Sequence, residues 1–188
     1  MRRPTLLAAM ALGLAGPLAA QNGREAFIQP DTAYDAIHAV QRDAFLVLRD
    51  STSSITGAGA KLMSDLTSSS SLPWMQARAR AVAAACGRSE SPLAAARAVT
   101  TAGDWPLDLQ KQAQANLLKA MKSFSTDLVD CKKRWTALAA DTSQASLREN
   151  IPYQMKLLQD NVDQFNRTAR IYLQYINVKL APTGTPKP

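Results

Sequence analysis

Residues 117–138 read LLKAMKSFSTDLVDCKKRWTAL, and this stretch decides the fold class. Its apolar side chains recur at alternating steps of four and three residues. This is the spacing of a helix that packs along its whole length against other helices. The residues on that face are Leu117, Met121, Phe124, Leu128, Cys131, Trp135 and Leu138. The pattern predicts a long core helix, and it specifies neither a reaction nor a ligand.

Two further stretches have helical spacing over a similar length. The C-terminal stretch carries apolar residues at Ile151, Met155, Leu158, Val162, Phe165, Ala169, Tyr172, Ile176 and Leu180. The N-terminal stretch carries them at Ile37, Val40, Ala44, Val47, Leu48, Ile55, Ala58, Leu62 and Leu66. We expect the C-terminal helix to begin at Asn150, which places Pro152 in the first turn. Proline is tolerated there, whereas in the interior of a helix its ring would clash with the carbonyl group one turn earlier.

The region between the first two long helices is less regular. Leu72-Pro73-Trp74 is typical of a helix start, and Gly87 is the expected end of that helix. Ser91-Pro92 is expected to begin a second short helix that ends at Gly103. Asp104-Trp105-Pro106 is expected to cap the long helix that follows.

These patterns together predict an all-α protein without strands. The predicted architecture is an elongated up-and-down helical bundle of three long helices plus a broken helical segment. Residues 21–180 are expected to form a single domain, since their number suits one. Residues 181–188 contain three prolines and no apolar pattern, so they are expected to form a disordered tail.

The first twenty residues have the composition of a secretory signal peptide. Arg2 and Arg3 give a positive start, residues 6–14 are apolar, and small residues at 19–20 precede Gln21. No later stretch approaches the roughly 18 uninterrupted apolar residues of a membrane helix. The sequence therefore predicts a protein exported to the bacterial periplasm or exterior, with no transmembrane helix.

The charge balance favours anionic surroundings without naming a partner. The chain has 22 Lys and Arg against 15 Asp and Glu, a net charge of +7. Removing Arg2 and Arg3 leaves 20 against 15, or +5, which suits phospholipid headgroups or cell-wall polymers and is also ordinary for a small domain. Nucleic acid is not an expected partner, because the protein is predicted to be exported and few aromatic residues alternate with its cations.

The two cysteines, Cys86 and Cys131, are expected to form a disulfide, because paired cysteines predominate in exported proteins. No Cys-x-x-Cys motif suggests a redox role. A bridge between them fastens the irregular region to the central helix. It also brings Lys132, Lys133 and Arg134 close to that region. The candidate site for an anion or a partner therefore consists of Arg78, Arg80, Arg88, Lys132, Lys133 and Arg134.

His38 is the only histidine, and it gives the alternative hypothesis. A helical bundle can hold haem or a metal between facing side chains. Met63, Met121 or Met155 is a conceivable second ligand beside His38. Neither a Cys-x-x-Cys-His motif nor a Glu-x-x-His pair occurs, so no cofactor or metal is expected.

No catalytic motif is present in the sequence. There is no Gly-x-Ser-x-Gly and no glycine-rich phosphate loop. The sequence therefore favours a monomeric, non-enzymatic bundle that binds a protein or an anionic polymer of the cell envelope. A bundle that binds a small ligand, haem or a metal near His38 is the alternative.

Overall fold

The computed structural model describes residues 32–178 and 180, with side chains described from residue 36 onward. The chain divides into two units, Met1–Asp35 and Ala36–Pro188, and the bundle belongs to the second unit. The predicted signal peptide (1–20) and the predicted tail (181–188) lie outside the described residues.

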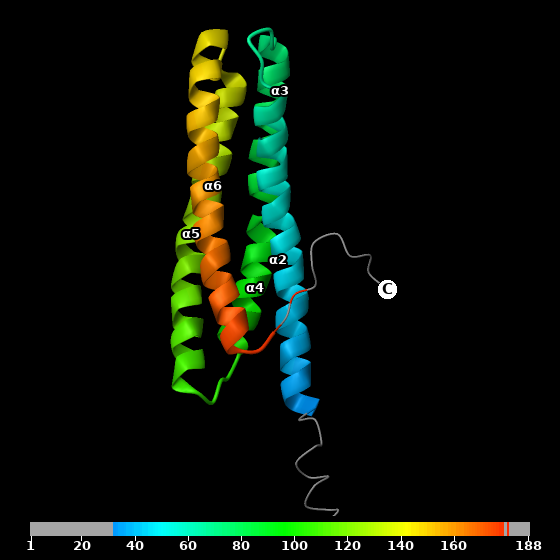
Figure 1. Ribbon diagram of the computed structural model, residues 1–188, viewed down its shortest axis with the longest axis vertical. Helices are drawn as coiled ribbons and strands as arrows, with labels where there is room; N and C mark the ends of the chain where they lie inside the picture. The colour runs from blue at the N-terminus through cyan, green and yellow to red at the C-terminus, as the bar shows by residue number, and fades with distance from the viewer. Residues whose placement is uncertain (1–31, 179, 181–188) are drawn as a thin grey trace, which may run out of the picture. The chain divides into compact units, whose positions relative to one another are not determined.

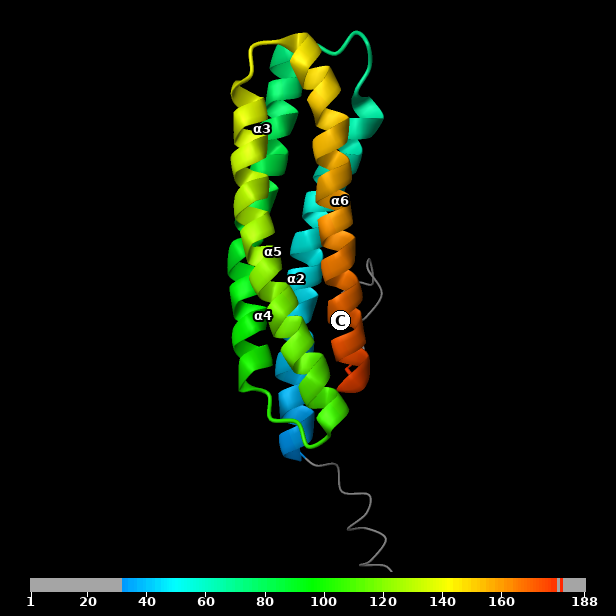
Figure 2. The ribbon, with the colours of Figure 1, turned by 90° about the vertical axis from the view of Figure 1, so that its left-hand side faces the viewer.

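The protein is an all-α helical bundle. Its helices are α2 (Thr32–Asp65), α3 (Leu72–Arg88), α4 (Glu90–Ala102), α5 (Asp108–Ala140) and α6 (Gln144–Tyr175). Figure 1 and Figure 2 show that α2 and α5 run in one direction, while α6 and the pair α3–α4 run back beside them. The predicted up-and-down order of three long helices and one broken segment is therefore confirmed. No strand occurs in the residues described.

The two stripes predicted for α5 and α6 form the core. On α5, six of the seven stripe residues are buried and Leu138 is half-buried. Of the nine residues in the C-terminal stripe, eight are buried and Leu180 is half-buried. α6 ends at Tyr175, so Ile176 and Leu180 lie beyond the helix that the stripe predicted. Between the two helices, Phe124 and Phe165 stack with ring centroids 4.4 Å apart. Heptad spacing located these core residues because nearly every stripe position is apolar.

The predicted core face of α2 is only partly right: Leu48, Ile55 and Leu62 are buried as expected, but the other predicted residues are half-buried or exposed. Val40 and Val47 are 54% and 58% exposed, whereas the buried row runs Gln41, Phe45, Leu48, Thr52, Ile55, Gly59, Leu62. The steps are again four and three, but two members are polar and one is glycine. Gln41 can be buried because its Nε2 donates to the Val99 carbonyl at 2.6 Å. The Thr52 hydroxyl donates in the same way to the Arg49 carbonyl at 2.9 Å.

The predicted break at Gly87 lies elsewhere. Gly87 is inside α3, and a single residue, Ser89, separates α3 from α4, so the expected restart at Ser91 is also wrong. The Ser89 side chain is buried, and its hydroxyl lies 2.6 Å from that of Ser51 on α2. Gly87 continues the helix, and the Ser89 hydroxyl joins the break to α2.

Two helix starts also differ from the prediction. The long helix α5 begins at Asp108, after Leu107, so Asp104-Trp105-Pro106 lies in the preceding loop. α6 begins at Gln144, and Pro152 lies inside it. The Ser143 hydroxyl accepts from the Ser146 N–H at 3.2 Å, and Leu147 is fully buried. This cap and the burial of the first turns stabilise α6 before its proline.

Side-chain amides and one guanidinium join the ends of the helices to the loops. At one end, Arg148 donates to the Ser68 and Ser70 carbonyls, and Gln144 donates to Ser70 at 2.7 Å. At the other end, Gln110 donates to the Tyr175 carbonyl at 3.0 Å. These bonds satisfy carbonyl groups that the helices and turns leave open.

Candidate functional site

The predicted disulfide is confirmed. The Sγ atoms of Cys86 and Cys131 lie 2.00 Å apart, and their Cα atoms are 6.2 Å apart. Both residues are buried, so the bridge joins α3 to α5 inside the bundle. The neighbouring α3 residues are small, with Ala79 and Ala85 fully buried. Small side chains allow the two helix backbones to approach closely enough for the bridge.

Acidic neighbours pair with three of the six predicted basic site residues. Arg78 lies 3.8 Å from Asp65 and stacks over the Trp74 ring. Lys132 lies 3.6 Å from Glu90, beside the break between α3 and α4. Arg134 lies 3.9 Å from Asp130, within its own helix, and lines a small pocket towards α6.

The other three basic residues, Arg80, Arg88 and Lys133, form no ion pair with any described residue, and all three are exposed. The six residues thus spread over several faces of α3 and α5, because side chains adjacent in sequence point in different directions around a helix. Anion binding by these residues stays a prediction.

His38 belongs to an aromatic group at the end of the bundle. Its ring stacks on Trp105 with centroids 6.0 Å apart, and Trp105 meets Tyr172 edge-on at 6.3 Å. Burial raises the pKa of the Tyr172 phenol to about 12. Met63 lies 25 residues along α2 from His38, roughly 38 Å at the helical rise, so these two cannot bind one haem.

No group of three potential metal ligands occurs among the described residues. Across residues 32–178 and 180, no helix combines the length and apolar character that a membrane span requires.

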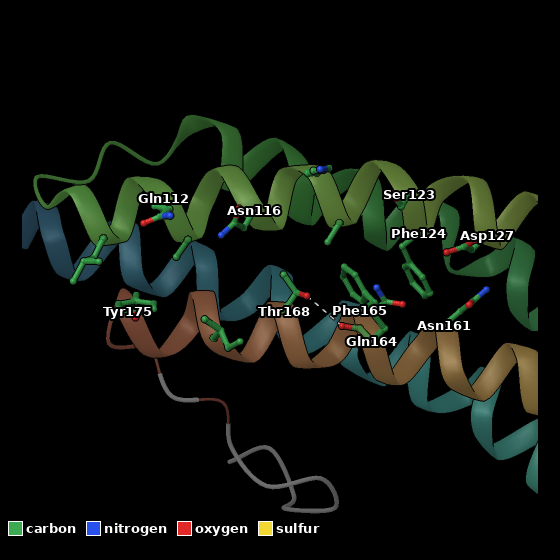
Figure 3. Close-up of a pocket in the computed structure, with 15 residues that line it drawn as sticks. Gln112, Asn116, Ser123, Phe124, Asp127, Asn161, Gln164, Phe165, Thr168 and Tyr175 are labelled. Atoms are coloured by element: carbon green, nitrogen blue, oxygen red, sulfur yellow. Dashed lines mark hydrogen bonds between the residues drawn. The ribbon is translucent and has the colours of Figure 1, made fainter.

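A hollow of about 620 Å³ lies along the contact between α5 and α6. We call it the α5–α6 groove. Its walls run from Leu109 to Asp127 on α5 and from Asn161 to Tyr175 on α6. Figure 3 shows the side chains of both helices around it, with the Phe124–Phe165 stack between the helices at one end and Tyr175 near the other.

The groove stays open because its flanks carry small or polar side chains. Ala113 and Ala120 on α5 lie on the groove side of the buried stripe, and Thr168 lines the opposite wall. Such residues cannot fill the space that the aromatic stack opens between the helices. The α5–α6 contact thus depends on one central row of large residues, and its edge remains accessible.

Four primary amides line this groove: Gln112 and Asn116 on α5, and Asn161 and Gln164 on α6 (Figure 3). None of these side-chain amides is hydrogen-bonded to another group in the part of the chain that the structure describes. Each amide offers two N–H donors and one carbonyl acceptor. The groove therefore presents an array of neutral donors and acceptors beside apolar surface.

Charge is almost absent from the groove. Among the described residues that line it, Lys119 carries a positive charge and Asp127 a negative one, so the lining has no net charge. Partial burial raises the pKa of Asp127, and Asp130 adds to the increase, while Arg134 opposes it. The carboxylate of Asp127 is therefore less well solvated than its neighbours on the surface of α5.

The sequence patterns did not indicate this groove, because neutral amides line it in place of the cation clusters, cysteines or histidine of familiar sites. The sequence contains one indication of the groove. Positions beside an apolar stripe usually carry charged residues. Gln112, Asn116, Asn161 and Gln164 place neutral amides there instead.

Comparison with protein-family models, with curated proteins and with solved structures gives no match for this chain.

Proposed function

We propose that this chain is a non-enzymatic binding protein that holds an extended segment of a partner polypeptide in the α5–α6 groove. The observation that carries the proposal is the set of four primary amides along an open groove between two long helices, none of them hydrogen-bonded to another described residue.

The amides favour an extended segment over a helical one. A helix satisfies its own N–H and C=O groups, so it gains little from a wall of amides. An extended chain leaves one donor and one acceptor unsatisfied at each residue. Gln112 and Asn116 can pair with such groups from one wall, and Asn161 and Gln164 from the other.

Exposed apolar residues supply anchors at one end of the groove. Leu109, Ile171 and Tyr175 are 59%, 51% and 47% exposed and line the same hollow. Burying large side chains of this kind provides most of the affinity in peptide grooves, while polar contacts fix the register. The expected segment therefore has bulky apolar side chains near one end and polar residues along its length.

The near-neutral lining argues against a polyanion as the occupant of this groove. Polyanion binding needs unpaired cations along the contact, and the groove offers Lys119 balanced by Asp127. A protein partner is therefore favoured over an anionic polymer at this site.

An exported location is part of the proposal. The disulfide between Cys86 and Cys131 fits an oxidising compartment, and residues 1–20 have the composition of a signal peptide. We propose that the protein acts in the periplasm or outside the cell and meets its polypeptide partner there.

Selection of a phage-displayed library of linear 12-residue peptides on the purified protein tests the function. We expect enriched peptides that bind in calorimetry and shift amide NMR signals of the groove residues. Asn116→Ala and Asn161→Ala should each weaken a selected peptide about threefold to tenfold, the effect of one lost hydrogen bond. Gln159→Ala, an exposed amide of α6 outside this groove, is the matched control and should leave affinity unchanged.

Three results contradict the proposal: no enriched peptide, NMR shifts away from the groove, or equal effects of all three variants. Uncharged oligosaccharides titrated in parallel distinguish a glycan strand from a polypeptide. If they bind in the groove and peptides do not, the polypeptide assignment is wrong.

A further inference from the structure

A second hollow runs along the other side of α6, between α6 and α2. We call it the α2–α6 groove; its volume is about 400 Å³. Its apolar lining comes from Phe45 and Leu48 on α2, from Ala169 and Leu173 on α6, and from Val178 after α6. It is separate from the α5–α6 groove, apart from Phe165, which contributes to both.

The chain turns back at the end of α6 to close one end of this groove. Asn177 has a φ of 57°, a left-handed conformation that asparagine tolerates better than most residues. The Val178 N–H then donates to the Leu173 carbonyl at 2.8 Å, as in a helix-ending Schellman motif. Val178 and Leu180 consequently add an apolar end to the groove.

The charged residues that line this groove are both cations. Arg170 is exposed and makes no ion pair with any residue of the described chain. Arg49 lies across from it on α2 and donates to its neighbour Asp50 at 3.0 Å. No carboxylate is among the described residues that line the groove. An apolar trough with guanidinium groups at its rim is complementary to a molecule with an alkyl chain and an anionic head.

We propose that the α2–α6 groove binds a free single-chain anionic amphiphile, of which a long-chain fatty acid carboxylate is the simplest member. The alkyl chain lies over Phe45, Leu48, Ala169 and Leu173. The carboxylate pairs with Arg170, and Asn166 and Gln174 provide further donors at the rim. This site is independent of the polypeptide function proposed for the α5–α6 groove.

Calorimetric titration of the full chain with carboxylates of eight to fourteen carbons, each below its micellar concentration, tests the proposal. Affinity should rise about fourfold for each added methylene until the groove is full. Dodecanol and dodecyltrimethylammonium should bind at least tenfold more weakly than dodecanoate, because neither offers an anion to Arg170.

Variants separate the head-group site from general surface charge. Arg170→Gln should weaken dodecanoate binding about tenfold. Arg167→Gln removes a neighbouring exposed charge of α6 that does not line the groove, and it should leave binding unchanged. Asn166→Trp, which fills the groove from a partly exposed position, should abolish binding, with circular dichroism confirming the fold. Ala120→Leu, in the α5–α6 groove, should have no effect on dodecanoate.

Four outcomes overturn the proposal. They are absence of binding, equal binding of the three head groups, equal effects of Arg170→Gln and Arg167→Gln, and binding only to anionic phospholipid vesicles. The last result assigns the cations to a membrane surface instead of a free amphiphile.

Discussion

The helices α3 and α6 both pack against α5, but in different ways. α3 presents small residues and a disulfide, so its contact with α5 is close and covalently fixed. α6 presents a row of large residues, including the Phe165 ring on Phe124, and hollows remain beside that row. The difference indicates that the size of the side chains at a helix contact decides whether the two helices pack closely or leave accessible grooves beside the contact.

Loss of the disulfide, which fixes the close contact between α3 and α5, should have the largest effect on stability. Replacing both Cys86 and Cys131 by serine should lower the free energy of unfolding by about 2–5 kcal/mol. Urea unfolding followed by circular dichroism measures the change. The same shift should follow reduction of the wild-type protein; equal midpoints for the oxidised and reduced forms would mean that packing alone holds α3 on α5.

Enlarging an alanine tests the comparison directly. Ala79 is fully buried on α3, so Ala79→Leu should cost about 1–3 kcal/mol through overpacking. Ala120 lines the open groove, so Ala120→Leu should change stability by no more than about 0.5 kcal/mol. Thermal unfolding of both variants measures the difference, and similar losses would show that the two contacts of α5 are packed alike.

Substitution of two glycines in α2 tests how closely α6 packs against α2. A Cβ at Gly57 meets nothing within 4 Å, so Gly57→Ala should add about 0.5–1 kcal/mol of stability through helix propensity. A Cβ at Gly59 overlaps the Met155 thioether, so Gly59→Ala should gain less or lose stability. If differential scanning calorimetry finds equal gains, Met155 moves aside without cost.

The smallest expected effect concerns Asp127. Burial raises its pKa, so the folded protein binds this proton more tightly than the unfolded chain does. Its ionisation therefore costs stability as the pH rises through the folded-state pKa, above the ordinary 3.8, and the cost disappears below that range. Asp127→Asn should raise stability at pH 7 by no more than about 0.5 kcal/mol, since the side chain is partly solvated.

Measurement of unfolding from pH 3 to pH 7 checks this sign. The variant should gain most at pH 7 and nothing at pH 3. A variant that is less stable than the wild type at pH 7 would mean that Arg134 stabilises the charged carboxylate by more than burial destabilises it.

The sequence was informative where local pattern and packing agree. The stripes of α5 and α6 consist almost entirely of large apolar residues, so spacing alone identified the core and the fold class. α2 was misjudged in part because Gln41 is buried through a hydrogen bond to the Val99 carbonyl of α4, while the Thr52 hydroxyl is satisfied within its own helix by the Arg49 carbonyl. Its exposed Val40 and Val47 resembled core residues.

The disulfide could be predicted from compartment and composition, whereas the grooves could not. A groove forms where side chains from two helices leave space between them, and here the small Ala120 on α5 and Thr168 on α6 both contribute to that space. No single stretch of sequence contains that information. The start of α6 was misplaced for a similar reason, because Leu147 is buried and Gln144 bonds to the Ser70 loop only in the folded bundle.

The affinity of Ala120→Leu for a selected 12-residue peptide tests the central claim most directly. The leucine side chain fills the α5–α6 groove without touching the contact between α3 and α5, so affinity should fall at least tenfold while the melting temperature stays near that of the wild type. Ala79→Leu should show the reverse, with reduced stability and wild-type affinity in its folded form. Wild-type peptide affinity in Ala120→Leu would contradict the assignment of binding to the α5–α6 groove.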